Sequence, residues 1–336
     1  MTSELLTIGD YELKLSEVLR ALSELRAKRV LVQLPEGLKR YYTAIADYIR
    51  SVADVEVYLD GSPVYGSCLL DLGKTEEYDL VIHVGHDPYP LGSRISSSPV
   101  VFVDLEYIGV DLEALLIEVE KYLTVCGSTN IAIVTTNQHK KLSRIMRERL
   151  KNRGFNVVLG PLVVFGCYTP PELKKSEVEV VLVVAGGVFH SIGVGMVVRS
   201  AKVVRVDPYT KRVTDASREV SKFVSIRLKK MYDALNARNW GVILGVSGQY
   251  RPWVVSKIVK TLKERERRFY LYTAPILDIN VLRNIDSPEL DAYVVTSCPR
   301  IAVDDLAEFE KPVLTPSEAV EVLEKGSIGR YPESLL

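Results

Sequence analysis

The sequence has few cysteines, no net charge and no long apolar run. Four cysteines in 336 residues are far fewer than a disulfide-stabilised secreted protein needs. The 43 basic and 43 acidic side chains cancel, so no global field attracts a nucleic-acid backbone or an anionic membrane surface. No run approaches the roughly 18–20 apolar residues of a membrane span, and the first residues, MTSELLTIGD, lack the features of a signal peptide. We therefore expect a cytoplasmic protein with reduced thiols and neither nucleic acid nor membrane as a direct partner.

Short β-branched runs alternate with amphipathic segments along the chain. This alternation is typical of strand-helix units with parallel sheets, so the fold class is α/β. Apolar residues make up 47% of the chain and charged residues 26%, which is the composition of a globular protein. The length indicates two or three domains.

The same order of elements recurs three times, which favours three similar domains. Each repeat has about four strands, a mainly parallel sheet and flanking helices. The predicted strands are 29–37, 55–59, 79–87 and 99–104, then 130–139, 156–160, 178–187 and 202–207, then 240–249, 268–273, 290–298 and 311–315. The predicted helices are 38–52, 140–153 and 252–266, with connecting helices near 111–124 and 215–237. The resulting domains are 1–124, 125–237 and 238–336, although the same strands also fit two larger doubly wound domains.

Three cysteines lie just after predicted strands. Cys68 and Cys167 follow the second strand of their repeats, whereas Cys298 follows the third strand of its repeat. Ligands of open α/β sheets bind outside the carboxyl ends of the strands. A single reduced cysteine is usually a small buried hydrophobe, and Cys126, at the end of a connecting helix, keeps that interpretation. One cysteine in each repeat, always at a strand exit, favours a shared central site between the domains.

The spacing of the three cysteines excludes a zinc ribbon or a short cluster motif, whose ligands come in local pairs. Three thiolates leave a metal centre one ligand short. In zinc enzymes the open fourth position is the catalytic one, and in a 4Fe-4S cluster the same logic leaves one iron free for substrate.

Other polar residues also follow strands. His86 and His190 occupy corresponding strand ends in the first two repeats, where they face the shared site or bond only to their own loops. His83, inside an apolar strand, is expected to be a core residue. In GQYRP (248–252), Gln249 and Arg251 precede a helix, where they either hold a carboxylate or ribose or form an ordinary turn.

Asp304 and Asp305 are adjacent carboxylates near the end of the chain. The pair is suggestive of acid-base chemistry. Carboxylates also stabilise the first turn of a helix through its dipole, and we expect this pair to open a helix.

The segments TSCPRIAVDD, GSPVYGSC, FGCYTP, IHVGHDP and GGVFH together resemble the archaeal diphthamide biosynthesis enzymes, the 2-(3-amino-3-carboxypropyl)histidine synthase family. The resemblance spans essentially the whole chain. It implies three similar α/β domains in a triangle, with Cys68, Cys167 and Cys298 holding one 4Fe-4S cluster. The CxxxCxxC loop of the common radical S-adenosylmethionine enzymes is absent from the sequence, which favours this family over that class.

The resemblance also implies a reaction. The family uses a noncanonical radical mechanism to transfer the 3-amino-3-carboxypropyl group of S-adenosylmethionine to a histidine of translation elongation factor 2, releasing methylthioadenosine. It further implies an electron donor and a homodimer. Two alternatives remain open: a non-catalytic, cluster-bearing scaffold or electron-relay subunit, and a zinc enzyme with three thiolates and a bound water.

Overall fold

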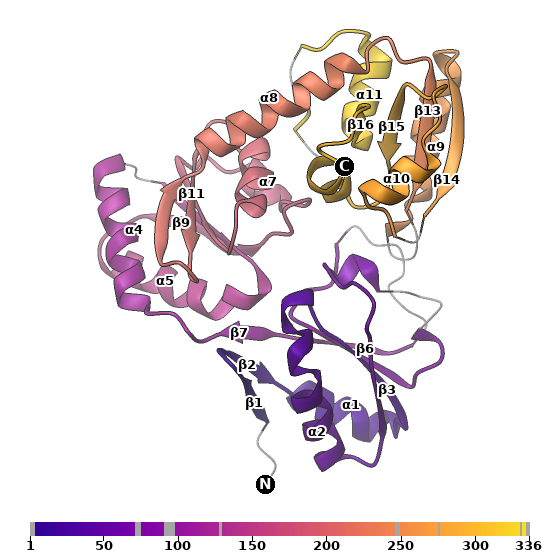
Figure 1. Cartoon of the computed structure of the whole chain (residues 1–336). Helices are drawn as coiled ribbons and strands as arrows, with labels where there is room; N and C mark the ends of the chain where they lie inside the picture. Colours follow the sequence, from indigo (N-terminus) through magenta and orange to yellow (C-terminus); the bar gives the residue numbers. More distant parts are fainter. Residues whose placement is uncertain are drawn as a thin grey trace. The chain divides into compact units, whose positions relative to one another are not determined.

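The computed structural model describes residues 4–70, 75–90, 98–127, 130–245, 249–274, 276–329 and 331–333. These residues form three mainly parallel sheets and one small antiparallel sheet (Figure 1). The chain groups into two compact units. Unit 1 comprises residues 1–163, 177–186 and 205–214, and unit 2 comprises residues 164–176, 187–204 and 215–336.

The first parallel sheet belongs to unit 1 and has the order β4-β3-β5-β6. Its strands are β3 (Arg29–Gln33), β4 (Glu56–Leu59), β5 (Leu80–Val84) and β6 (Val100–Val103). β3 and β5 are largely buried and apolar, apart from Arg29, Gln33 and His83, and two helices pack on one face of the sheet. The helices are α1 (Ser16–Leu25) and α2 (Tyr42–Val52), the latter preceded by the 3-10 segment η1 (Glu36–Tyr41). Their apolar residues join both strands in one core.

A small antiparallel sheet of unit 1 was not predicted. It has the order β1-β2-β7 and consists of β1 (Leu5–Ile8), β2 (Tyr11–Lys14) and β7 (Leu105–Tyr107). The strands are short and alternate polar with apolar residues, so they lack the continuous apolar run that identifies a buried parallel strand.

The second sheet has the order β12-β11-β10-β8-β9. Its strands are β8 (Ile131–Thr135), β9 (Val157–Val163), β10 (Val180–Val184), β11 (Lys202–Asp207) and β12 (Arg212–Asp215). β8 pairs in parallel with both β9 and β10. The predicted helices are present as α4 (Leu112–Cys126) and α5 (Lys140–Asn152). β12 makes a fifth strand where four were expected.

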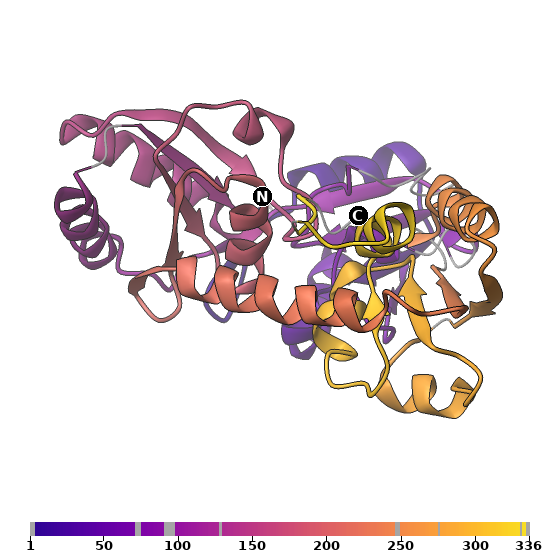
Figure 2. The same ribbon diagram turned by 90° about the horizontal axis from the view of Figure 1, so that it is seen from above.

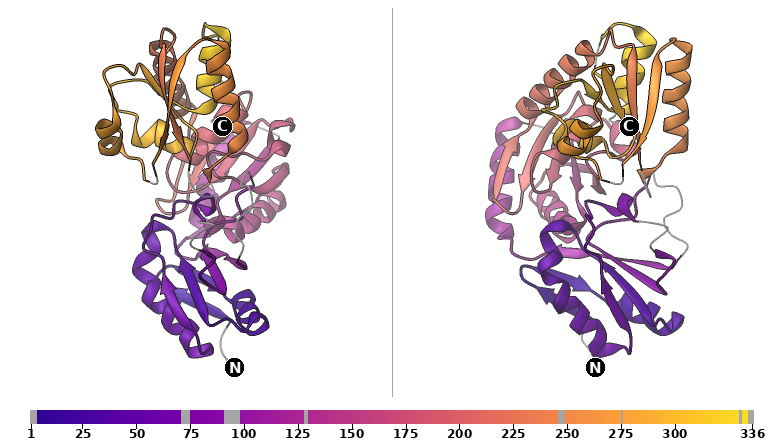
Figure 3. Two further views of the ribbon diagram at one scale, coloured as in Figure 1. Left: turned by 90° about the vertical axis from the view of Figure 1, so that its right-hand side faces the viewer. Right: turned by 45° about the vertical axis from the view of Figure 1, so that its right-hand side comes forward.

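The third sheet lies in unit 2, has the order β14-β13-β15-β16 and is parallel throughout. Its strands are β13 (Asn239–Leu244), β14 (Arg268–Thr273), β15 (Ala292–Val295) and β16 (Val313–Leu314). Alternate residues face opposite sides. Trp240 and Val242 pack with α9 (Pro252–Glu264) and α11 (Pro316–Lys325), whereas Ile243 packs with α10 (Ile279–Ile285). The helices of the third sheet thus lie on both of its faces (Figure 3).

Unit 2 also contains α6 (Pro171–Lys174), α7 (Phe189–Val197) and the long helix α8 (Ser217–Asp233). Figure 2 shows α8 side-on as one uninterrupted helix.

Each predicted strand and helix overlaps an element of the structure, so the α/β class with mainly parallel sheets is confirmed. The parallel sheets occupy residues 29–103, 131–215 and 239–314. The domain boundaries after residues 124 and 237 stay a prediction. No helix in the described part of the chain is long and apolar enough to cross a membrane.

A buried ion pair fixes α8 to the third sheet. The Arg227 guanidinium donates to both carboxylate oxygens of Glu318 on α11, at 2.8 and 2.6 Å. It also donates to the carbonyls of Ala302 and Val313, and the Tyr331 hydroxyl donates to Glu318 at 2.6 Å. Both charged side chains are essentially inaccessible. Every arm of the pair is thus satisfied by groups of unit 2, as a buried charge requires.

Replacing Glu318 with Ala is expected to lower the free energy of unfolding of unit 2 by about 3–5 kcal/mol, because Arg227 becomes an uncompensated buried charge. The measurement is urea denaturation of the full chain followed by the fluorescence of Trp240, which is buried in the same core. The control is Glu310→Ala, which breaks an exposed pair with Arg283 and should cost at most about 1 kcal/mol. Equal effects of the two substitutions would show that the buried pair does not hold α8 in place.

Candidate metal centre

Cys68 lies in a loop that two side chains hold against the first sheet. It belongs to the 3-10 segment η2 (Ser67–Leu69), which follows β4. The Ser67 hydroxyl donates to the Asp87 carbonyl at 2.6 Å, and the Val64 amide donates to a carboxylate oxygen of Glu36 at 2.8 Å. The Cys68 loop is therefore attached directly to the loop that carries His86.

His83 and His86 form a hydrogen-bonded pair at the end of β5. His83 is fully buried, and its Nδ1 lies 2.9 Å from Oε1 of Gln33 while its Nε2 lies 3.1 Å from Nδ1 of His86. The prediction that His83 is a satisfied core residue is confirmed. Burial lowers the pKa of His83 to about 3, with a further contribution from His86, and burial lowers the pKa of His86 to about 4. Both rings are therefore neutral at neutral pH.

Polar residues after β8 join the first two sheets within unit 1, and the sequence analysis missed them. The Asn137 side chain donates to the carboxylates of Asp87 at 2.9 Å and Asp104 at 3.0 Å. The Lys140 ammonium also binds both carboxylates, at 3.1 and 2.5 Å. The signal was present, because NQHK (137–140) is a polar run directly after an apolar strand, as GHDP is after β5.

The Cys167 loop packs against the start of α7. Gly166 has φ +72°, a conformation that glycine adopts without strain, and a Cβ there would lie 2.4 Å from the Phe189 ring. A Cβ on Gly193 would lie 1.9 Å from the Gly166 carbonyl oxygen. Only glycines allow this close approach. The structure thus brings Cys167 next to the helix whose second residue is His190.

Phe189 also links this loop to the segment after Cys298. The Arg300 guanidinium lies over the Phe189 ring, 5.1 Å from its centroid. The Phe189 ring therefore lies against Gly166 and also against the side chain of Arg300, which belongs to the helical turn after Cys298. Unit 2 holds its two cysteine loops against the same aromatic side chain.

Arg251 is buried beside Cys298. The guanidinium, on a side chain 4% exposed, donates through Nη2 to the carbonyls of Thr296, at 3.0 Å, and Ser297. Gln249 is also buried, while Gly248 of the same motif lies outside the described residues. The predicted role of Gln249 and Arg251 in binding a cofactor stays a prediction. What the structure adds is that Arg251 holds the two peptide carbonyls that lead into Cys298.

The expectation that Asp304 and Asp305 open a helix was wrong. They are the last two residues of a π-helical segment, η5 (Ile301–Asp305), and the helical turns begin at Pro299. Proline favours the first turn because it has no amide hydrogen to leave unsatisfied, so the helix starts directly after Cys298. Asp304 instead forms an ion pair with Arg300 at 2.8 Å. Partial burial raises the pKa of Asp305.

All four cysteines are partly accessible and form no disulfide. Cys126 is the last residue of α4, away from any strand end. Within the described residues, no three His, Cys, Asp or Glu side chains are gathered as a metal site, so the three-cysteine ligand set stays a prediction.

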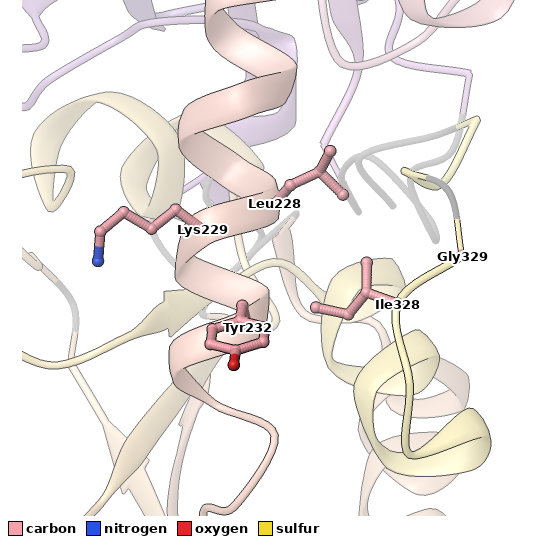
Figure 4. Close-up of a pocket in the computed structure, with 5 residues that line it drawn as sticks. All are labelled: Leu228, Lys229, Tyr232, Ile328 and Gly329. Carbon is pink, nitrogen blue, oxygen red and sulfur yellow. The ribbon is translucent and has the colours of Figure 1, made fainter.

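A hollow of about 380 Å³ lies between α8 and the segment after α11 (Figure 4). Leu228, Lys229, Tyr232, Ile328 and Gly329 line it, and none of them is a predicted site residue.

The chain is similar to known proteins of one family. The model of the diphthamide synthesis protein family matches residues 34–332. The 2-(3-amino-3-carboxypropyl)histidine synthase of Pyrococcus horikoshii is 33% identical, over 93% of this chain and 90% of the relative. Subunit 1 of the human synthase is 29% identical, over 94% of this chain and 72% of the human protein.

Solved structures agree. Dph2 from Pyrococcus horikoshii with a 4Fe-4S cluster is 31% identical, with a TM-score of 0.80 over 96% of this chain and 92% of that one. A second crystal structure of the same protein gives a TM-score of 0.81 at 30% identity. The resemblance seen in the cysteine and histidine segments is thereby confirmed, and the chain belongs to the diphthamide synthesis protein family.

Proposed function

We propose that this chain catalyses the first step of diphthamide biosynthesis. In this reaction the 3-amino-3-carboxypropyl group of S-adenosylmethionine is transferred to a histidine of translation elongation factor 2, and methylthioadenosine is released. The observation that carries the proposal is the placement of three cysteines, none in a disulfide, in the loops that follow β4, β9 and β15, in a chain whose relatives are 2-(3-amino-3-carboxypropyl)histidine synthases.

The residues present fit a 4Fe-4S cluster. Thiolates are the ligands that such clusters take, and Cys68, Cys167 and Cys298 form no disulfide and are partly accessible. The Dph2 of Pyrococcus horikoshii has been solved with this cluster. Three cysteine ligands leave one iron open for substrate. When bound, the cluster supplies the electron that cleaves the bond between sulfur and the γ-carbon of S-adenosylmethionine, as a radical-type transferase requires.

The chain's own residues hold the ligands in place. Arg251 fixes the peptide carbonyls before Cys298, Phe189 supports the Cys167 loop, and Ser67 ties the Cys68 loop to Asp87. His86, His190 and Gln249 stay candidate contacts for S-adenosylmethionine. The proposal includes a cytoplasmic homodimer that draws its electron from a separate donor.

The ligand set is tested by anaerobic reconstitution with iron and sulfide. Cys68→Ser, Cys167→Ser and Cys298→Ser should each lose most of the visible absorbance of the cluster, because each removes one of three thiolates. Cys126→Ser is the matched control and should retain it. Full absorbance in any of the first three variants would contradict the assignment. Zinc without iron or sulfide in anaerobically purified protein would instead identify the three-thiolate zinc enzyme.

Arg251→Ala should loosen the turn at Cys298. It leaves two buried carbonyls without a donor, at about 1–3 kcal/mol for each unsatisfied group. The direct readout is hydrogen exchange of the Ile301 amide, which donates to the Cys298 carbonyl at 3.1 Å and should exchange at least several-fold faster. Arg251→Lys should restore part of the protection, and Arg283→Ala, on the exposed face of the same unit, should change nothing. Unchanged exchange in Arg251→Ala would mean that the arginine does not position the cysteine.

A further inference from the structure

Four polar side chains cross the carboxyl edge of the first sheet in a continuous hydrogen-bonded row. Asp60 follows β4, Gln33 ends β3, His83 lies on β5 opposite Gln33, and His86 follows β5. Gln33 Nε2 donates to Oδ2 of Asp60 at 2.8 Å, and the next two links measure 2.9 and 3.1 Å. All four residues belong to unit 1.

The donor and acceptor of each hydrogen bond in this row follow from the Asp60 carboxylate, which can only accept hydrogen bonds. It already accepts the Ser62 amide on Oδ1 at 2.9 Å. The amide nitrogen of Gln33 must therefore face Asp60, which leaves the Gln33 oxygen facing His83. His83 then donates from Nδ1, and its Nε2 is an acceptor.

The same logic determines the state of His86. Since Nε2 of His83 accepts, Nδ1 of His86 must carry the proton, and Nε2 of His86 keeps its lone pair. The reversed tautomers would set two acceptors, Gln33 Oε1 and His83 Nδ1, against each other at 2.9 Å. A doubly protonated His83 is disfavoured, because burial lowers its pKa to about 3. Gln33 and His83 are both buried, so water does not compete for these bonds.

The backbone that carries His86 is attached to the loop of Cys68, a predicted metal ligand. His86 precedes Asp87, whose carbonyl holds Ser67, the neighbour of Cys68. In the proposed reaction the bond that breaks lies in the amino acid part of S-adenosylmethionine, so that part must lie close to the cysteine ligands. The α-ammonium of this group is a cationic N–H donor, and a neutral imidazole nitrogen accepts from it without charge repulsion.

We propose that Asp60, Gln33 and His83 fix His86 in the Nδ1-protonated tautomer, and that Nε2 of His86 accepts a hydrogen bond from the α-ammonium of the substrate's amino acid group. The inference rests on the proposed function and deepens it. His86 is then a substrate-binding residue, and the other three are positioning residues.

The binding half of the proposal is tested by comparing two ligands of the full, anaerobically reconstituted chain. S-adenosylmethionine carries the amino acid group, and methylthioadenosine lacks it. His86→Ala should weaken the affinity for S-adenosylmethionine by about 10- to 100-fold, the range of a charge-assisted hydrogen bond, and leave that for methylthioadenosine unchanged. The control is Gln138→Ala, which removes a 2.8 Å bond to the Gly85 carbonyl beside His86 without touching the row. It should affect neither affinity.

The positioning half is tested without any ligand. The chain has four histidines, so the ring nitrogens of His83 and His86 can be assigned by single substitutions in ¹⁵N NMR spectra. At pH 7 both rings should show a protonated Nδ1 and an unprotonated Nε2. Gln33→Leu, which removes the link to Asp60, should give His86 a mixture of tautomers. It should also reduce the affinity for S-adenosylmethionine but not for methylthioadenosine, while the melting temperature confirms that the variant is folded.

The outcomes separate this inference from the proposed function. A wild-type chain that binds no S-adenosylmethionine contradicts the proposed function itself. A chain that binds it, but loses affinity for both ligands equally in His86→Ala, contradicts only the ammonium contact. A protonated Nε2 on His86 in the wild-type spectrum overturns the direction of the row.

Discussion

The common polarity of parallel strands is the constraint on which this chain depends. Strands buried on both faces are mainly apolar, and the carboxyl ends of parallel strands all meet at one edge of a sheet. Cys298, His86 and the run that begins at Asn137 all follow such ends. Apolar β-branched residues fill the strands themselves. The same pattern therefore positions both the core and the candidate site. The buried apolar residues lie within the strands, and the candidate site residues lie in the segments that follow them.

In both units, buried polar groups form connected hydrogen-bonded sets. In unit 1 the set runs from Asp60 to His86, and in unit 2 it centres on Arg251 and on the pair of Arg227 with Glu318. Such groups are costly when unpaired and rigid when paired. Arg227 also binds the Ala302 carbonyl, four residues after Cys298, so the ion pair that anchors α8 also supports the turn that carries the cysteine.

The parallel strands were predictable because their apolar runs depend little on neighbours. The hairpin of β1 and β2, and β12, were missed because short alternating strands are defined by their partners. The sequence predicted which candidate site residues follow strands. It did not predict which groups their side chains contact. Gln33 and His83 lie 50 residues apart, and no local pattern joins them. Asp304 and Asp305 were misassigned because the helix begins earlier, at Pro299.

We propose that this chain uses its three cysteine loops to transfer the 3-amino-3-carboxypropyl group to a protein histidine. The most direct measurement is mass spectrometry of translation elongation factor 2 after anaerobic incubation with the reconstituted chain, S-adenosylmethionine and a reductant. We expect one added 3-amino-3-carboxypropyl group on a single histidine, with an equal amount of methylthioadenosine. An unmodified elongation factor in the presence of an intact cluster would contradict this proposal.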